Sequence, residues 1–379
     1  MTEGIEILIA KYCSDKLTDD EMKNLIGWIE VGKNKKIFND YISLNFTIEE
    51  LKNENQDDSI LWKHIESSFK NPERKLSFWK YAVAASIVLL ISLTFIFNRD
   101  NTEIVEPIVV NNNIKVGTDK ATLTLEDGSE IVLGKGETFI KDNLESTGGD
   151  LIYKSSTTKN SEISYNYLTI PRGGQYHVKL SDGTQVWLNS ESKLKYPVNF
   201  NEGEARTVEL VYGEAYFDVS PSTQHQGDNF KVIHNRQEVR VLGTEFNIKA
   251  YNDENTISTT LVEGKVAIEY SKIKQNLYPN QQFEINILNN FFSVKEVDVK
   301  SEISWKDGVF SFKEKTLGEI MKVLSRWYDM DVIFENKSLG AVKFKGALRK
   351  HQSIEEILNV IMSSSIDNYE IKDKTLILK

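Results

Sequence analysis

The sequence has few of the residues that build disulfide frameworks, metal centres or nucleic-acid surfaces. Its single cysteine is Cys13, so residues 98–379 must be held together by packing rather than by disulfides. The five histidines are scattered without clustered partners, which argues against a zinc site. The net charge is −10 and the only basic cluster lies at residues 70–80, which argues against direct binding of nucleic acid. No constellation of titratable residues predicts an enzyme, and we expect neither a cofactor nor a metal.

One long apolar run stands out, from Trp79 to Phe97. It carries no charge after Lys80, and about 19 apolar residues suffice for a helix that crosses a bilayer. Its few hydroxyl side chains can bond to carbonyls of their own helix. We therefore predict a transmembrane helix at residues 79–97.

Charges on either side of this run predict its orientation. The basic residues lie before it, and the residues after it are mostly acidic: Lys70, Arg74, Lys75 and Lys80, then Arg99, Asp100, Glu103 and Glu106. Basic residues favour the cytoplasmic side, and the run lies too far from residue 1 to be a cleaved signal peptide. We expect a single-pass protein of the cytoplasmic membrane, with the N-terminus in the cytoplasm and the C-terminus in the periplasm.

Residues 1–75 show helical periodicity and predict a small all-α cytoplasmic bundle. A capping box at Thr18–Glu21 opens a helix with Leu25 and Ile29 on its apolar stripe. A bundle of about 70 residues has a marginal core of its own. It is either a solvated tail or a docking module that gains stability on a partner. Five apolar side chains are candidates for such an interface: Trp28, Ile29, Phe38, Tyr41 and Trp62.

After a polar linker at residues 98–114, the period changes from helical to alternating. Residues 115–300 predict an all-β periplasmic domain, built as a sandwich, a barrel or a solenoid. Two hairpins share the pattern L-x-D-G-[ST]-x-[IV]-x-L, at residues 125–133 and 180–188, which indicates an internal repeat. Glycines separate the later strands, so Gly213 is expected to divide Arg206–Leu210 from Glu214–Val219.

Residues 303–379 predict a compact C-terminal α+β domain with a β-α-β repeat. Thr316–Glu319 and Ser353–Glu356 are two matched capping boxes, each opening an amphipathic helix. Such a domain could dock a partner by strand addition. The expected edge strands are Val342–Leu348 and Thr375–Leu378.

The β region resembles the FecR family of transmembrane anti-sigma factors. The segments that carry this resemblance are Ile170–Tyr176, Leu180–Asn189, Tyr196–Pro197, Gly213–Val219, Val241–Ile248 and Thr259–Gly264. Trp305–Gly308 and Arg326–Tyr328 are similar to the C-terminal domain that often follows in this family. The resemblance covers about residues 110–379 and departs visibly at Ile170, where a threonine is more usual.

The resemblance implies partners on both sides of the membrane. Residues 1–75 would bind an extracytoplasmic-function sigma factor. The C-terminal domain would resemble the secretin and TonB short N-terminal fold and receive a signal from the signalling domain of a TonB-dependent outer-membrane receptor. Site proteases would then free the sigma factor. Some members also cleave themselves at a Gly-Thr bond, which corresponds here to Gly243-Thr244.

Two other functions are compatible with the sequence. The first is a membrane-tethered periplasmic binding or adhesion module whose cytoplasmic helices bind nothing. The second is an enzyme, for which only Gly243-Thr244 offers a candidate, and that would be one self-cleavage rather than turnover.

Overall fold

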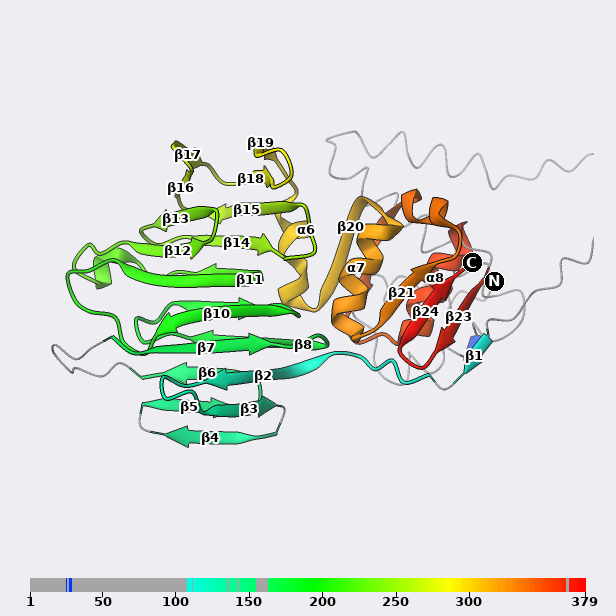
Figure 1. Ribbon diagram of the computed structural model, residues 1–379, viewed down its shortest axis with the longest axis horizontal. Coiled ribbons are helices and arrows are strands. Elements are labelled where there is room, and N and C mark those ends of the chain that lie inside the picture. Colours follow the sequence, from blue (N-terminus) through cyan, green and yellow to red (C-terminus); the bar gives the residue numbers. More distant parts are fainter. Residues whose placement is uncertain are drawn as a thin grey trace, which may run out of the picture. The chain divides into compact units, whose positions relative to one another are not determined.

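The computed structural model describes residues 25, 27–28, 108–110, 112–134, 136–141, 143–154, 163–365 and 368–379 (Figure 1). The chain divides into two units, Met1–Thr102 and Glu103–Lys379. In the first unit the described residues are Leu25, Gly27 and Trp28, and all three are helical.

The predicted fold class is wrong for this structure. The described chain is mostly β, and neither a small all-α bundle nor a transmembrane helix is found in it. No helix among the described residues combines the length and the apolar character needed to cross a membrane. The predicted span at 79–97 and nearly all of the predicted bundle lie outside the described residues. The predicted bundle and span rest on apolar patterns within residues 1–97. The described residues instead show mostly period-two alternation, which is typical of strands.

The β domain, residues 118–296, consists of short strands joined mostly by tight turns. Its strands are β2 (Thr118–Thr124), β3 (Glu130–Gly134), β4 (Thr138–Lys141), β5 (Leu144–Thr147), β6 (Asp150–Tyr153), β7 (Tyr165–Ile170), β8 (Gly174–Lys179), β9 (Gln185–Leu188), β10 (Ser192–Pro197), β11 (Arg206–Asp218), β12 (Phe230–His234), β13 (Gln237–Val241), β14 (Glu245–Ala250), β15 (Thr256–Glu263), β16 (Val266–Tyr270), β17 (Ile273–Leu277), β18 (Gln281–Asn286) and β19 (Phe291–Glu296). A short 3-10 helix, η1 (Ser222–Gln224), lies between β11 and β12.

These strands form two sheets that meet in β11. The first has the order β3-β2-β7-β10-β11-β12-β13-β16-β17. The second has the order β4-β5-β6-β8-β9-β11-β14-β15-β18-β19. Most neighbours are antiparallel, while β11–β12 and β6–β8 are parallel.

Strand β11 changes sheet at Gly213. Residues Arg206–Glu209 pair with β12 in the first sheet, and Gly213–Asp218 pair with β14 in the second. Gly213 has φ +100, and a Cβ there would lie 2.4 Å from the Cα of Ser192. Only glycine fits this crossing, because both the φ angle and the space exclude a side chain. Gly213 therefore joins the two predicted strands into one instead of separating them.

The two predicted Asp-Gly hairpins are present and have the same turn. In β2–β3 the Asp127 carboxylate accepts a bond from the Ser129 amide at 2.8 Å, and in β8–β9 Asp182 accepts from Thr184 at 2.9 Å. The turn glycines have φ +82 and +86. The sequence repeat is therefore a repeat of turn chemistry, and the two hairpins lie in different sheets.

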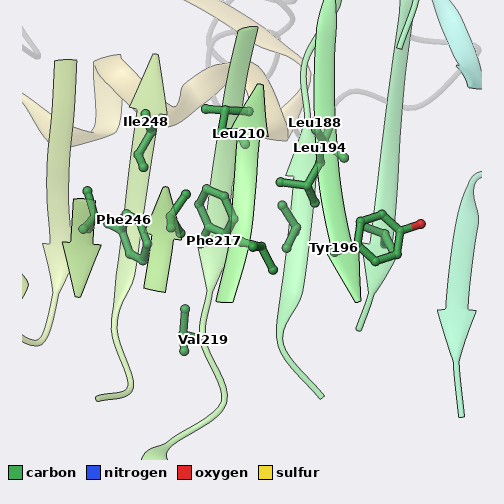
Figure 2. Packing of buried hydrophobic residues seen from close by; sticks show 14 of the residues in the cluster. Leu188, Leu194, Tyr196, Leu210, Phe217, Val219, Phe246 and Ile248 are labelled. Carbon is green, nitrogen blue, oxygen red and sulfur yellow. The ribbon is translucent and has the colours of Figure 1, made fainter. Parts of the chain in front are cut away.

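The core lies between the two sheets and follows the alternation of the strands. β10 in the first sheet contributes Leu194 and Tyr196, and β14 in the second contributes Phe246 and Ile248; all four are buried. Figure 2 shows these side chains turned toward the same interior layer. Phe217 and Phe246 stack with ring centroids 5.0 Å apart. Burial of each such side chain contributes about 1.5–3 kcal/mol.

The C-terminal domain, residues 309–378, has its own core. Two short helices, α6 (Val299–Ile303) and η2 (Ser304–Asp307), lead into it from the β domain. Its elements are β20 (Val309–Thr316), α7 (Leu317–Tyr328), β21 (Asp331–Phe334), η3 (Lys337–Ala341), β22 (Lys343–Arg349), α8 (Ile354–Ser365), β23 (Tyr369–Lys372) and β24 (Thr375–Leu378). Both predicted capping boxes form, since Thr316 and Glu319 bond reciprocally and so do Ser353 and Glu356.

The sheet of this domain includes a strand from the predicted linker. Its order is β1-β23-β24-β21, where β1 is Ile108–Val110, while β20 and β22 pair separately. Of the two predicted edge strands, β24 is interior, because it pairs with β23 on one side and β21 on the other. β22 pairs only with β20 within the described ranges.

Candidate functional site

The junction between the β domain and the C-terminal domain is the most elaborate polar site of the described chain. We use "junction" for Arg172, Gln175, Tyr251, Glu254, Arg326, Trp327 and Lys350. Some of these side chains form contacts between residues more than 70 positions apart in the sequence. The others line the cavity between the two domains. Figure 1 shows α7 beside the ends of the β-domain strands.

Arg326 on α7 is the central side chain of the junction. It is 4% exposed, and its Nη1 donates to Glu254 at 2.7 Å, its Nη2 to Asp253 at 2.5 Å and its Nε to Glu191 at 3.2 Å. The guanidinium also lies 3.7 Å from the ring centroid of Tyr251. Burial acts to lower the pKa of Arg326, but Tyr251, Glu254 and Asp253 outweigh it and raise the pKa above its ordinary value. The buried cation is thus paired on every side, as a buried charge requires.

Arg172 makes the reverse contact, from the β domain to the end of α7. It lies in the turn after β7, and its guanidinium donates to the carbonyl of Ser325 at 3.1 Å and to that of Met330. Its neighbour Gly173 donates its amide to the carbonyl of Arg326 at 2.6 Å. The last carbonyls of a helix have no partner within the helix, and a cation there also opposes the helix dipole. The Pro171-Arg172-Gly173-Gly174 turn therefore caps α7 from the other domain.

Lys350, in the turn after β22, lies inside an aromatic cage at the same junction. It is 4% exposed, and its Nζ is 4.4 Å from the ring centroid of Trp327 and 5.4 Å from those of Trp305 and Phe310. Nζ also donates to Oε1 of Gln175, in β8, at 2.9 Å. Burial lowers the pKa of Lys350 to about 7, while the more distant Glu214 and Asp119 raise it. The ammonium thus has partners in both domains.

A cavity of about 720 Å³ opens between the two domains next to Arg326. Glu214 is on its wall and is buried, and its carboxylate accepts bonds from Asn189 at 2.9 Å and Asn247 at 3.0 Å. Burial raises the pKa of Glu214. Lys249 and Glu254, also on the wall, form an ion pair at 2.8 Å. Each of these charged side chains therefore has a partner within the wall.

The described residues contain no cluster of three or more His, Cys, Asp and Glu side chains that could hold a metal ion. The junction fixes α7 against the β domain through bonds that a shift of one domain must break.

The predicted cleavage motif lies in the turn between β13 and β14, away from the junction residues. Gly243 has φ +146, and a Cβ there would lie 2.9 Å from the Cα of Pro221. Thr244 is buried, and its hydroxyl donates to the carbonyl of Lys265 at 3.0 Å. The hydroxyl is therefore bonded to a neighbouring turn in this conformation. Cleavage at Gly243-Thr244 stays a prediction.

The predicted sigma-factor interface is placed only at one position. Trp28 is helical and half-buried. Ile29, Phe38, Tyr41 and Trp62 lie outside the described residues. The role of all five stays a prediction.

The sequence pattern does not predict the junction, although both segments that build it are present in the sequence motifs. Arg172 and Arg326 both appear in motifs that carried the family resemblance. The available signal was an arginine among the apolar residues of α7, since Arg326 is followed by Trp327 and Tyr328, which are buried too. The carboxylates that pair with Arg326 lie 72–135 residues away, so no local pattern could identify them.

Comparison with known proteins agrees with this arrangement of domains. Residues 166–267 match the family model described as FecR protein, and residues 309–378 match that of FecR, C-terminal. None of the curated proteins matches the chain.

A candidate anti-sigma factor from Parabacteroides distasonis ATCC 8503 has a similar crystal structure, determined at 1.65 Å and at 2.50 Å resolution. The first structure is 28% identical to this chain and the second 27%, each with a TM-score of 0.51. Each likeness covers 56% of this chain and 98% of the other. Two regions of the chain therefore resemble the two domains of the FecR family, in this order along the sequence.

Proposed function

We propose that this protein is an anti-sigma factor that relays a signal from its C-terminal domain to a sigma factor held by residues 1–75. The observation that carries the proposal is the ordered pair of FecR domains, together with the likeness to a candidate anti-sigma factor. The sigma factor would be of the extracytoplasmic-function type. Residues 1–75 would bind it through Trp28, Ile29, Phe38, Tyr41 and Trp62.

The junction supports a relay because it makes the two domains one mechanical unit. Arg326 and Lys350 of the C-terminal domain bond to β-domain residues, and Arg172 of the β domain bonds to α7. A partner that tilts the C-terminal domain must pull on these contacts. The partner proposed is the signalling domain of a TonB-dependent outer-membrane receptor. Of the two candidate edge strands, β24 is interior to its sheet, so we propose docking at β22.

The location of the chain is part of the same proposal. A cytoplasmic N-terminus and a periplasmic C-terminus would put the sigma factor and the receptor within reach of the two ends. Site proteases would then release the sigma factor. A reporter enzyme that works only in the periplasm should be active when fused after Lys379 and inactive when fused near residue 75; the reverse pattern would reject this orientation.

The direct test is capture of a sigma factor by the full chain. We expect a tagged chain to co-purify one sigma factor from its own cells, and a chain with Trp28→Ala and Phe38→Ala to capture less of it. A matched control is Phe291→Ala, which removes a large aromatic that is 66% exposed on β19, far along the sequence. Failure of the unsubstituted chain to capture any sigma factor would reject the proposal.

A further inference from the structure

The segment that enters the β domain passes first through the C-terminal domain. β1 pairs in parallel with β23, in the register Ile108↔Glu370, Val109↔Ile371 and Val110↔Lys372. β23 belongs to the last hairpin of the chain, more than 250 residues later. Residues 98–114 are therefore not a free tether along their whole length.

After β1 the same segment stays in contact with the C-terminal domain. The amide of Asn113 donates to the carbonyl of Asp373 at 3.2 Å, and the side chain of Asn112 bonds to Glu355. Ile114 is buried within the core of that domain. At Gly117 a Cβ would lie 2.6 Å from the Trp327 ring, so the backbone passes directly against the junction. These contacts anchor residues 112–117 more firmly than β1 itself.

β1 is the weak end of this segment. It has three residues, it pairs on one side only among the described residues, and its partner strand does not depend on it. β23 is held by β24 through four antiparallel register pairs, and Tyr369 and Ile371 are buried in the core. Short edge strands open at low free-energy cost compared with core strands. Loss of β1 would leave the β23–β24 hairpin intact and expose a row of unpaired backbone groups on β23.

We infer that the outer edge of β23 is a strand-binding site whose resident ligand is β1, a releasable strap. An extended peptide that pairs with β23 in parallel competes with β1 for the same backbone groups. Occupation of the edge by such a peptide frees the segment before Asn112, which leads back to the first unit of the chain. The inference goes beyond the anti-sigma proposal and does not depend on a sigma factor.

The test uses an engineered disulfide in the full chain. The single native cysteine allows a clean background, Cys13→Ser. Val110→Cys and Lys372→Cys are register partners, and Lys372 is exposed, so mild oxidation should join them with high yield. The matched control joins Val110→Cys with Asp331→Cys, which is also exposed but lies on β21, at the opposite edge of the same sheet. This control pair should join severalfold less.

Competition then tests whether the strap is releasable. The probe is a synthetic peptide with the sequence of residues 104–114, IVEPIVVNNNI. In excess, it should lower the yield of the 110–372 disulfide severalfold, whereas a scrambled peptide should not. The chain already joined at 110–372 should bind the labelled peptide far more weakly than the reduced chain does.

Hydrogen exchange on the unsubstituted chain tests the same replacement without cysteine substitutions, so a folding defect of the variants cannot explain the result. Edge amides of residues 370–372 should stay protected when the peptide is present, while amides of residues 108–110 should lose protection. Equal disulfide yields for the two cysteine pairs would overturn the pairing. A disulfide yield that the peptide does not change would contradict the idea that a peptide can replace β1 on β23. Equal peptide binding to the joined and the reduced chain would contradict it as well.

Discussion

At the scale of single residues, the junction depends on cations that are buried with their partners. Arg326 has three carboxylates and an aromatic ring around it. Arg206, within the β domain, is buried in the same way and pairs with Asp182 at 2.8 Å. Removing one member of a buried pair leaves the other charge unpaired, which costs more than the pair contributes.

We expect Arg326→Met to destabilise the chain by about 3 kcal/mol, because Glu254, Asp253 and Glu191 would lose the cation they share, although Glu254 keeps its ion pair with Lys249. Chemical denaturation of the full chain, followed by tryptophan fluorescence, measures this. The matched control is Arg240→Met. Arg240 also pairs with two carboxylates, Glu238 and Glu269, but its side chain is 43% exposed, so we expect about 1 kcal/mol or less. Similar losses in both variants would contradict the role given to Arg326.

The buried ammonium of Lys350 predicts a dependence of stability on pH. Its pKa is about 7 in the folded state, against 10.5 for a lysine exposed to water, so between these values the unfolded chain binds a proton that the folded chain lacks. The contribution of Lys350 to the free energy of unfolding is therefore full above pH 10.5 and is lost as the pH falls through 7.

We expect Lys350→Met, which keeps the length of the side chain, to flatten the rise in stability between about pH 7 and 10. Denaturation at several pH values across this range measures the slope. Lys313→Met on β20 is the control, since Lys313 is exposed and should leave the slope unchanged. A slope that survives in Lys350→Met would show that other groups carry the pH dependence.

The Thr244 hydroxyl is the nucleophile in the predicted self-cleavage. If the chain cleaves itself, purified full-length protein should separate into two fragments that meet at Gly243-Thr244, and Thr244→Ala should abolish this without any protease being involved. Thr207→Ala, which removes a hydroxyl from β11, should leave cleavage unchanged. Intact unsubstituted protein after prolonged incubation would contradict the prediction.

At the scale of secondary-structure elements, the crossing of β11 between two sheets depends on Gly213. We expect Gly213→Ala to cost about 1–3 kcal/mol for positive φ and a similar amount for the clash with Ser192. The matched control is Gly203→Ala. Gly203 also has positive φ, +79, but a Cβ there would meet nothing within 4 Å, so only the first cost applies. Thermal unfolding of the two variants measures the difference, and equal midpoints would show that the clash relaxes freely.

At the scale of the whole molecule, the proposed relay separates signal reception from sigma-factor binding. Deleting residues 303–379 should abolish the response to the receptor's ligand and leave capture of the sigma factor by the rest of the chain intact. A transcriptional reporter for the sigma factor, measured with and without the ligand, tests the first part, and co-purification tests the second. Unchanged induction after the deletion would reject docking at the C-terminal domain.

Local features of this protein could be read from the sequence because short-range physics decides them. Asp127-Gly128 and Asp182-Gly183 each place a carboxylate and a positive φ at fixed positions, and both form the expected turn. The capping boxes at Thr316 and Ser353 likewise bond within four residues. The order of elements in the C-terminal domain follows from the same signals.

Features that depend on distant partners were decided only by the tertiary structure. The sequence could not show that β11 runs through Gly213, because the reason is the approach of Ser192. It could not place β24 inside its sheet or add β1 beside β23, since alternation reveals which face is buried but not which strands are neighbours. The role of Arg326 was hidden for the same reason: its partners lie on loops that only the packing of the C-terminal domain against the β domain brings within hydrogen-bonding distance.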